Sequence, residues 1–235
     1  MKFNLPRPVM DDEKLNQVAL REIRRQKIEV SRATQKNLRE LAEVCKAIEE
    51  SGLPDNLICK KLPDGLGMGV FLHPKAKPML KGQIIASYSG VVSLISQNLP
   101  DDSAYAFAPI VDIPLTKEEQ AYFTPKSRYH PKRLHALDVD AVKKGNFTRF
   151  INHSDKPNVV AHLFKIPPNE FSLAPSPIEV IYTVKKTIHP GEQLLVCYEG
   201  DGDSYWNFLK IKPISITPKT FFLNASLKVE KRKQS

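Results

Sequence analysis

The sequence has no apolar run that approaches the roughly 18–20 residues of a membrane-spanning helix. Residues 1–14 contain no apolar core of the kind found in a secretory signal, so we expect no signal of that type. An apolar content of 41% over 235 residues is enough to bury a core. The composition therefore predicts a globular protein rather than a disordered one.

Cysteine is scarce, with three residues that lie far apart at Cys45, Cys59 and Cys197. An odd number in no metal-ligand spacing disfavours both a disulfide framework and a zinc cluster, and we expect no metal site. The simplest interpretation is three small buried hydrophobic residues. A reducing, intracellular compartment is the natural location for such a chain.

Positive charge, by contrast, is in excess, with a formal net charge of +9. Residues 11–50 hold nine basic and nine acidic residues, so the excess belongs to the rest of the chain, including the closing run 228–233. Such an excess predicts an anionic partner, for example DNA contacted through a basic surface and tail. The closing run alone has two alternatives: a nuclear localisation signal or a solvated disordered tail.

Residues 11–50 lack proline and glycine and are predicted to be helical, with a break near 31–34. An apolar stripe at three- and four-residue steps comprises Leu38, Leu41, Ala42, Cys45 and Ile48. Ser51-Gly52 is a stop signal. The stripe either packs within the chain or forms an interface, and in the second case it would support a homodimer through the N-terminal helices.

From residue 53 onward, short apolar runs alternate with turns. Strands are predicted at 70–72, 84–88, 178–184 and 194–198. Turns are predicted at 63–65, 81–82 and 189–191, a short helix at 115–122 and a loop at 165–177. Strand and helix do not alternate, which disfavours a doubly wound parallel sheet. The pattern predicts an α+β protein whose main part is β-rich.

Four short motifs follow one another in the chain. They are Gly65-Leu-Gly67-Met-Gly69-Val-Phe71, Ala86-Ser-Tyr88-Ser-Gly90-Val-Val92, the segment 139–158, and Gly191-Glu-Gln-Leu-Leu-Val-Cys-Tyr198. The third is the most specific, because Arg-Phe-Ile-Asn-His-Ser at 149–154 is followed by Pro-Asn at 157–158. Polar side chains at that density need partners, and a ligand can supply them.

In order and spacing these motifs resemble those of the SET-domain protein lysine methyltransferases, over roughly residues 62–206. The resemblance implies a SET fold of several short-stranded sheets with a knot-like C-terminal threading, preceded by a helical segment. It divides the chain into a helical segment at 1–52, a SET domain at 53–200, and a flank at 201–235 that closes the lysine channel and ends in the basic tail.

The function implied by the resemblance is methyl transfer from S-adenosylmethionine to the ε-amine of lysine. Cysteine-rich zinc segments are absent, so the chain is most similar in style to small bacterial SET proteins of intracellular pathogens. That similarity implies a histone or histone-like substrate, and, for an exported effector, the host nucleus rather than the cytoplasm as its place of action. The alternative is a catalytically weak SET-like module that recruits chromatin or nucleic-acid partners.

The resemblance also assigns residues to the cofactor. Glycines let the backbone approach a ligand closely, and polar side chains such as Asn152 and His153 bind its polar ends. Arg149 offers a donor fork for a carboxylate, with pairing to an internal acid such as Asp140 as the alternative. Trp206 would stack on adenine or cap the channel. The assigned set is Gly67, Met68, Gly69, Arg149, Phe150, Asn152, His153, Tyr198 and Trp206.

Tyr198 takes the family's catalytic tyrosine position, and Tyr88 and Tyr105 match further residues of the lysine channel. Aromatic walls lower the pKa of the lysine by desolvation and hold a methylammonium product. Tyr182 is a candidate for a place beside the channel, with a half-buried strand residue as the alternative.

Three positions depart from the family pattern: Val91 stands where many relatives have Glu, Asp155 where many have Cys, and Val196 where many have Phe or Tyr. Because the last position helps to set the number of methyl groups added, that number is not predicted. A charge of +9 repels a lysine-rich substrate at long range. Either DNA bound by both proteins or an acidic rim would offset this repulsion; the rim would comprise Asp101, Asp102, Glu199, Asp201 and Asp203.

Overall fold

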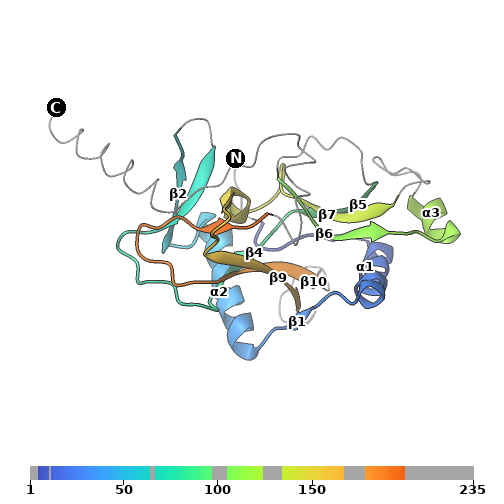
Figure 1. Cartoon of the computed structure of the whole chain (residues 1–235), viewed down its shortest axis with the longest axis horizontal. Coiled ribbons are helices and arrows are strands. Elements are labelled where there is room, and N and C mark those ends of the chain that lie inside the picture. The colour runs from blue at the N-terminus through green and yellow to red at the C-terminus, as the bar shows by residue number, and fades with distance from the viewer. Residues whose placement is uncertain are drawn as a thin grey trace. The chain divides into compact units, whose positions relative to one another are not determined.

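The computed structural model describes residues 5–10, 12–63, 67–96, 105–123, 134–166 and 178–198 (Figure 1). Its helices are α1 (Glu13–Gln26), α2 (Gln35–Ser51), α3 (Lys117–Phe123) and the 3-10 helix η1 (Phe147–Phe150). Its strands are β1 (Ser31–Arg32), β2 (Leu57–Lys61), β3 (Met68–Leu72), β4 (Ile84–Ser87), β5 (Val91–Ser96), β6 (Ala106–Ile113), β7 (His135–Asp140), β8 (Asn152–His153), β9 (Val159–Lys165), β10 (Ile178–Val184) and β11 (Leu195–Val196). No helix in these ranges is long and apolar enough to cross a membrane.

The strands form four small sheets. One has the order β1-β9-β10-β4, and another is the antiparallel sheet β5-β7-β6. The remaining two are the antiparallel pair β2-β3 and the parallel pair β8-β11. The predicted α+β class, with several short-stranded sheets and a helical segment before them, is confirmed. The knot-like threading stays a prediction.

The break predicted inside the N-terminal helical segment is confirmed. Helix α1 ends where Lys27 adopts a left-handed conformation with φ 53°. Helix α2 begins with a capping box, in which Thr34 Oγ1 accepts from Asn37 N–H at 3.2 Å and Asn37 Oδ1 accepts from Thr34 N–H at 3.0 Å. Between the two helices, β1 pairs in parallel with β9. Two residues carry no alternation, so the sequence could not predict this strand.

The predicted strand at 178–184 coincides with β10, and those at 70–72 and 84–88 fall on β3 and β4. The strand predicted at 194–198 is wrong in length, because only 195–196 pair as β11. The short helix predicted at 115–122 is present as α3. The sequence missed the whole β5-β7-β6 sheet.

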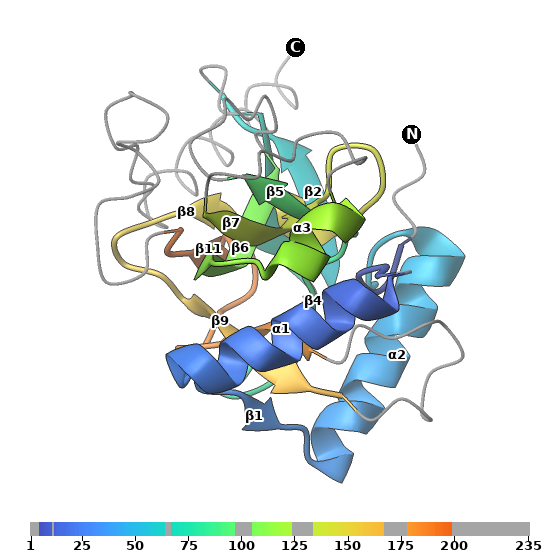
Figure 2. The ribbon, with the colours of Figure 1, turned by 90° about the vertical axis from the view of Figure 1, so that its right-hand side faces the viewer.

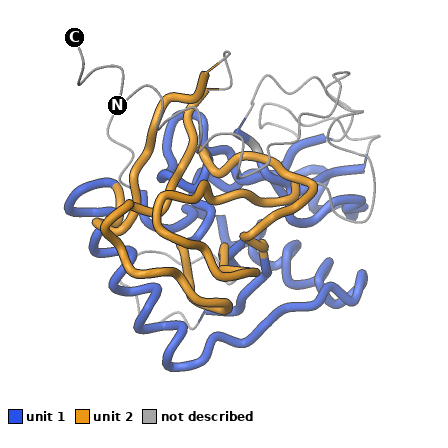
Figure 3. The backbone as a smooth tube through the Cα atoms, turned by 60° about the vertical axis from the view of Figure 1, so that its left-hand side comes forward, with its two compact units in different colours: residues 1–52, 86–149, 162–181 blue, residues 53–85, 150–161, 182–235 orange. Residues whose placement is uncertain are grey.

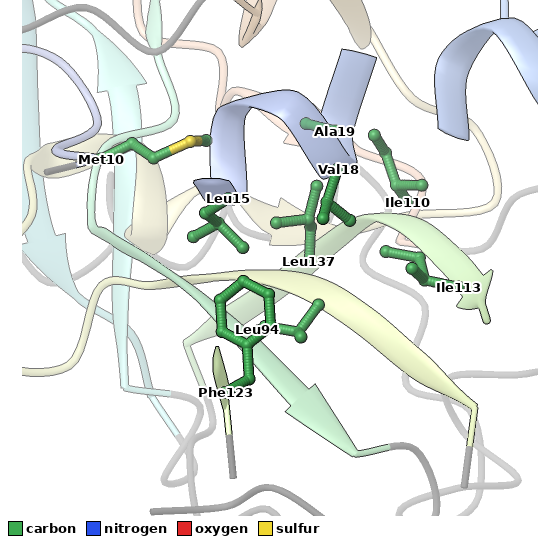
Figure 4. Packing of buried hydrophobic residues seen from close by; sticks show 9 residues of the cluster. All are labelled: Met10, Leu15, Val18, Ala19, Leu94, Ile110, Ile113, Phe123 and Leu137. Carbon is green, nitrogen blue, oxygen red and sulfur yellow. The ribbon is translucent and has the colours of Figure 1, made fainter. Parts of the chain in front are cut away.

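The chain divides into two compact units: unit 1 comprises residues 1–52, 86–149 and 162–181, and unit 2 comprises 53–85, 150–161 and 182–235 (Figure 3). In unit 1, one face of α1 packs on the β5-β7-β6 sheet (Figures 2 and 4). The buried cluster is Met10, Leu15, Val18, Ala19, Leu94, Ile110, Ile113, Phe123 and Leu137. In unit 2, Leu62, Phe71 and Leu195 form a smaller cluster with Ile58. The division at 52/53 and 200/201 stays a prediction.

The apolar stripe of α2 is covered within this chain. Leu38, Leu41, Cys45 and Ile48 are all buried, the least exposed being Ile48 at 0%. Ala42, predicted in the same stripe, is exposed instead. These burials favour packing within the chain as the role of the stripe.

We expect Ile113→Ala to lower the free energy of unfolding by about 2–5 kcal/mol, because it leaves a cavity in the cluster under α1. Ile113 is 0% exposed. Val111→Ala on the same strand is the matched control, since Val111 is 41% exposed. The control should stay within about 0.5 kcal/mol of the parent in urea titrations. Equal losses in the two variants would contradict the packing described.

Candidate functional site

The first group of candidate residues lies in unit 2, where the third motif meets the glycine motif. Asn152 Nδ2 donates to the carbonyl oxygens of Met68 at 2.8 Å and Phe150 at 3.2 Å. These two bonds fix the side-chain amide of Asn152. Asn152, Met68 and Phe150 are each partly exposed, so this junction is open to a ligand.

The two described glycines of the glycine motif are required for different reasons. Gly67 is exposed with φ +74°, a left-handed conformation that favours glycine, and a Cβ there would meet nothing within 4 Å. Gly69 is buried, and a Cβ there would lie 2.7 Å from Gln193 Nε2 and 3.0 Å from Leu62. Internal packing therefore explains Gly69, while the open space at Gly67 is compatible with a ligand.

His153 is buried and held at both ring nitrogens. Its Nδ1 accepts the backbone N–H of Tyr198 at 3.0 Å, and its Nε2 lies 3.2 Å from Asp155 Oδ1. Because Nδ1 is an acceptor, the ring proton resides on Nε2 and is donated to Asp155. The unusual Asp155 thus has a structural role here, which is to orient His153.

Tyr198 reaches this group through the parallel pair β8-β11, in which Asn152 lies opposite Leu195 and His153 opposite Val196. Its hydroxyl donates to the carbonyl oxygen of Ile151 at 2.9 Å, and its ring centroid lies 5.5 Å from that of His153. Since the hydroxyl proton is used in this bond, the lone pairs of the oxygen remain suited to accept another hydrogen bond.

Asn158 supports this arrangement and was given no role from the sequence. Its side chain accepts from Leu195 N–H at 2.8 Å and donates to the Gln193 carbonyl at 2.8 Å. Its own carbonyl accepts from the N–H groups of Lys185 at 2.8 Å and Lys186 at 3.3 Å. The Pro-Asn that closes the third motif therefore ties β11 to the chain around it. Burial is not visible in the sequence, so only the position of Asn158 inside the third motif could have indicated this role.

The second group lies in unit 1 and joins Tyr88, Tyr105 and Arg149. The Tyr88 hydroxyl donates to the Tyr105 carbonyl at 2.7 Å. The Arg149 guanidinium lies 4.8 Å from the Tyr105 ring centroid, and Nη1 donates to the carbonyls of Ala141 and Val142. Arg149 is buried, so these contacts favour an internal role for it over carboxylate binding.

A buried ion pair between Arg7 and Glu179 was not predicted from the sequence. Arg7 Nε donates to Glu179 Oε1 at 2.7 Å, and the two side chains are 4% and 0% exposed. Burial raises the pKa of Glu179, and the Arg7 guanidinium and the Ser87 side chain oppose this rise. The next residue, Val180, accepts the Tyr88 N–H at 2.8 Å. The pair therefore adjoins the backbone that holds Tyr88.

Residues 5–10 form an N-terminal arm along the same region of unit 1. Val9 N–H donates to the Gly90 carbonyl at 2.9 Å, and Val92 N–H donates to the Val9 carbonyl at 2.9 Å. Gly90 admits no side chain, because a Cβ would lie 2.5 Å from the Asp140 oxygen. The arm thus extends the edge of the β5-β7-β6 sheet beside the Tyr88–Gly90 turn.

The burial of the three cysteines and of Tyr182 can be compared with what the sequence predicted. Cys45 is buried, and burial followed by the nearby Glu179 charge raises the pKa of its thiol to about 12. Cys59 is partly exposed and Cys197 is exposed, so the prediction of three buried cysteines is wrong for Cys197. Tyr182 is fully buried, and burial raises its pKa. This agrees with a packed strand residue.

We expect an alkylating reagent at about pH 8 to modify Cys197 and to leave Cys45 unmodified until the chain unfolds. The thiolate is the nucleophile, and both burial and a raised pKa deny it to Cys45. Mass spectrometry of peptides after a timed reaction, with and without denaturant, measures the difference. Equal rates at the two thiols in the folded protein would contradict this expectation.

Several predicted residues lie outside the described part of the chain. These are Gly65, Trp206, the acidic rim residues Asp101, Asp102, Glu199, Asp201 and Asp203, and the basic run 228–233. Within the described ranges, no group of three or more His, Cys, Asp or Glu residues could hold a metal ion.

Comparison with known proteins gives one family match, to the SET domain model over residues 67–199. No curated protein sequence matches. Similar solved structures include ATXR5 in complex with methylated histone H3.1 (16% identity, 86% of this chain, 96% of that chain, TM-score 0.49). The methyltransferase domain of human histone-lysine N-methyltransferase SETMAR is another (20% identity, 65% and 47%, TM-score 0.41). So is Arabidopsis thaliana SUVH6 in complex with SAM (25% identity, 66% and 29%, TM-score 0.42). The chain spans 28% and 25% of the length of two KRYPTONITE chains that it also matches.

Proposed function

Since the chain belongs to the SET domain family, we propose that it is a protein-lysine N-methyltransferase that moves a methyl group from S-adenosylmethionine to the ε-amine of lysine. The proposed substrate is a histone or histone-like basic protein. The proposal rests on the group of residues in unit 2. There the Tyr198 hydroxyl donates to the Ile151 carbonyl and the Tyr198 N–H donates to His153 Nδ1. Beside them, Asn152 Nδ2 donates to the Met68 carbonyl.

The residues at this junction fit the amino-acid end of S-adenosylmethionine. The backbone at Gly67 has open space where a side chain would stand. Within the described part of the chain, Asn152 uses only its Nδ2, so its Oδ1 remains an acceptor for an ammonium group. When bound, the cofactor would supply the methyl group on a sulfonium cation. Phe150, whose carbonyl accepts from Asn152, and His153 are proposed for the same cofactor site, and Trp206 is proposed to stack on adenine or to cap the channel.

The chain's own residues would align the lysine and handle its charge. The amine must be neutral to use its lone pair, and desolvation by aromatic walls lowers its pKa. The Tyr198 oxygen, whose own proton is donated to Ile151, would accept an amine N–H and so direct the lone pair. Tyr88 and Tyr105 are also proposed as catalytic residues, because their motifs resemble those of the family's lysine channel. Alignment alone is worth about 7 kcal/mol or more in good cases.

The second candidate is a SET-like binding module without turnover. It is kept because Asp155 and Val196 depart from the family pattern. The structure favours the enzyme on one point: Asp155 supports His153, so the departure does not dismantle the group around Tyr198.

Incubation of the protein with labelled S-adenosylmethionine and with histones or bacterial histone-like proteins tests the proposal. We expect label on lysine, identified by mass spectrometry of the substrate. Cofactor binding without label on any of these substrates would instead support the binding module, and failure of both would sink the proposal.

The proposed partners follow from charge. A net charge of +9 must be offset near a lysine-rich substrate, either by the acidic rim or by DNA that both proteins bind. A homodimer through the N-terminal helices is a further proposal, as are the reducing compartment and, for an exported bacterial effector, the host nucleus.

We expect Asn152→Ala to weaken binding of S-adenosylmethionine about tenfold, because the Asn152 Oδ1 acceptor is lost together with the hydrogen bond from Nδ2 to the Met68 carbonyl. Isothermal calorimetry measures the affinity. Gln17→Ala, at an exposed position of α1, is the control and should bind as the parent does. Unchanged affinity in Asn152→Ala would remove this residue from the cofactor site.

A further inference from the structure

The positive charge of the chain is distributed unevenly between the two units. The described residues of unit 2 include eight lysines and no arginine against three acidic residues. Those of unit 1 include 15 basic and 14 acidic residues. The excess positive charge of the described residues therefore belongs mainly to unit 2, and the residues of unit 1 are nearly balanced.

Much of this charge gathers where two backbone segments run side by side. Gly82 N–H donates to the Val184 carbonyl at 2.8 Å, and Met79 and Ile188 exchange two bonds of 3.0 Å. The segment 79–83 is thus antiparallel to 184–188. This pairing brings Lys81 beside Lys185 and Lys186, which are consecutive in the facing segment.

A third segment, 156–158, brings one more lysine to this group. The N–H groups of Lys185 and Lys186 both donate to the carbonyl of Asn158, two residues after Lys156. We name the resulting group the lysine cluster, which comprises Lys81, Lys156, Lys185 and Lys186. All four side chains are exposed.

The lysine cluster is not neutralised within the described part of the chain. None of its four ammonium groups forms an ion pair there, whereas Lys36 and Lys46 of α2 pair with Glu40 and Glu50. Segments 77–82, 156–158 and 184–188 contain no acidic residue. The nearest in sequence, Asp155, is engaged with His153. Four like charges on adjoining backbone repel one another, so an anionic partner is favoured.

We infer that the lysine cluster docks on the phosphate backbone of duplex DNA. Lysine is a hydrated point charge that contacts phosphates without reading sequence. The three segments contain no aromatic residue on which unpaired bases would stack. Leu80, at 58% exposure, is a single apolar side chain and forms no amphipathic helix for a membrane surface. The choice of DNA rests on the proposed function, since a basic histone-like substrate is itself held on DNA.

Fluorescence anisotropy of the full chain with a labelled random-sequence duplex tests the inference. The test variant carries Lys81→Ser, Lys156→Ser, Lys185→Ser and Lys186→Ser. The control carries Lys36→Ser, Lys46→Ser, Lys117→Ser and Lys165→Ser, which remove the same charge from exposed positions of unit 1. We expect the test variant to bind about tenfold or more weakly and its salt slope to fall by about 3 to 4. The control should bind as the parent does.

A second measurement does not depend on the variants. Amine-reactive footprinting of the parent protein, with and without the duplex, should show protection at the lysine cluster and none at Lys36 or Lys46. Equal weakening of the two variants, or absence of protection, would overturn the inference. Tighter binding to phosphatidylserine vesicles or to polyglutamate than to the duplex would also overturn it and would name the alternative partner.

Methyl transfer to a short basic peptide without DNA separates the two proposals. The four-lysine variant should transfer methyl groups to such a peptide at the parent's rate. A parent that binds DNA through the cluster but transfers no methyl group would refute the proposed function and leave the DNA surface standing. A parent that transfers methyl groups but does not bind DNA through the lysine cluster would refute the DNA surface alone.

Discussion

Arg7→Met is expected to lower the free energy of unfolding by about 3–5 kcal/mol, because it leaves Glu179 buried without its counter-charge. The Arg7 and Glu179 side chains are 4% and 0% exposed, so water cannot replace the lost partner. Urea titration followed by circular dichroism measures the loss. Arg39→Met, at an exposed position of α2, should change stability by less than about 0.5 kcal/mol.

The double variant Arg7→Met, Glu179→Leu separates the charge from the packing. Replacing both partners of a buried pair with apolar residues is often neutral, so most of the lost stability should return. A double variant as unstable as Arg7→Met would show that the site demands the pair for its shape rather than for its charge balance.

The loss in Arg7→Met should also depend on pH. Burial raises the pKa of Glu179 and Arg7 opposes this, so removing Arg7 raises the pKa of the folded state further. The folded state then holds a proton that the unfolded chain releases, and stability falls as pH rises above the unfolded pKa. The variant should therefore lose less stability at about pH 5 than at about pH 8.

Tyr198→Phe is expected to lower kcat for methyl transfer about 100-fold, because the lysine amine loses the acceptor that orients it. The change also leaves the Ile151 carbonyl without the donor it has at 2.9 Å, which costs about 1 kcal/mol of stability. Cofactor affinity should change little. Steady-state assays with saturating labelled cofactor and substrate measure kcat apart from binding.

Tyr122→Phe is the matched control for this change. Tyr122 is 41% exposed on α3, and its hydroxyl lies 3.3 Å from Asp12. The control should transfer methyl groups at the parent's rate. Label transfer in Tyr198→Phe at an undiminished rate would remove Tyr198 from the reaction and would return the binding module to first place.

The sequence predicted the unit 2 group because its members lie in two short contiguous motifs. Asn152 and His153 are adjacent, and Tyr198 closes the motif that pairs with them as β11. The role of Asp155 could not be predicted from the sequence. It depends on the fold, in which the Tyr198 N–H donates to His153 Nδ1 and leaves Nε2 to the Asp155 carboxylate.

Long-range contacts and buried polar residues account for what the sequence missed. Arg7 and Glu179 are 172 residues apart, and neither stands in a motif. Strand β7 was hidden because His135 and Asp138, each 1% exposed, interrupt its apolar pattern. Strand β6 was hidden by Pro109 and by register shifts at Ile110 and Ile113.

The N-terminal arm has a consequence for the order in which the chain acquires its structure. Arg7 and Val9 leave the ribosome early, but the partner of Arg7 is made 172 residues later. Until Glu179 is synthesised, Arg7 lacks its ion pair with Glu179 and unit 1 lacks part of its interior. Closure over so long a stretch is slow and follows the local helices. Nascent chains halted before β10 should therefore be open to proteases at the arm, while released chains become resistant there.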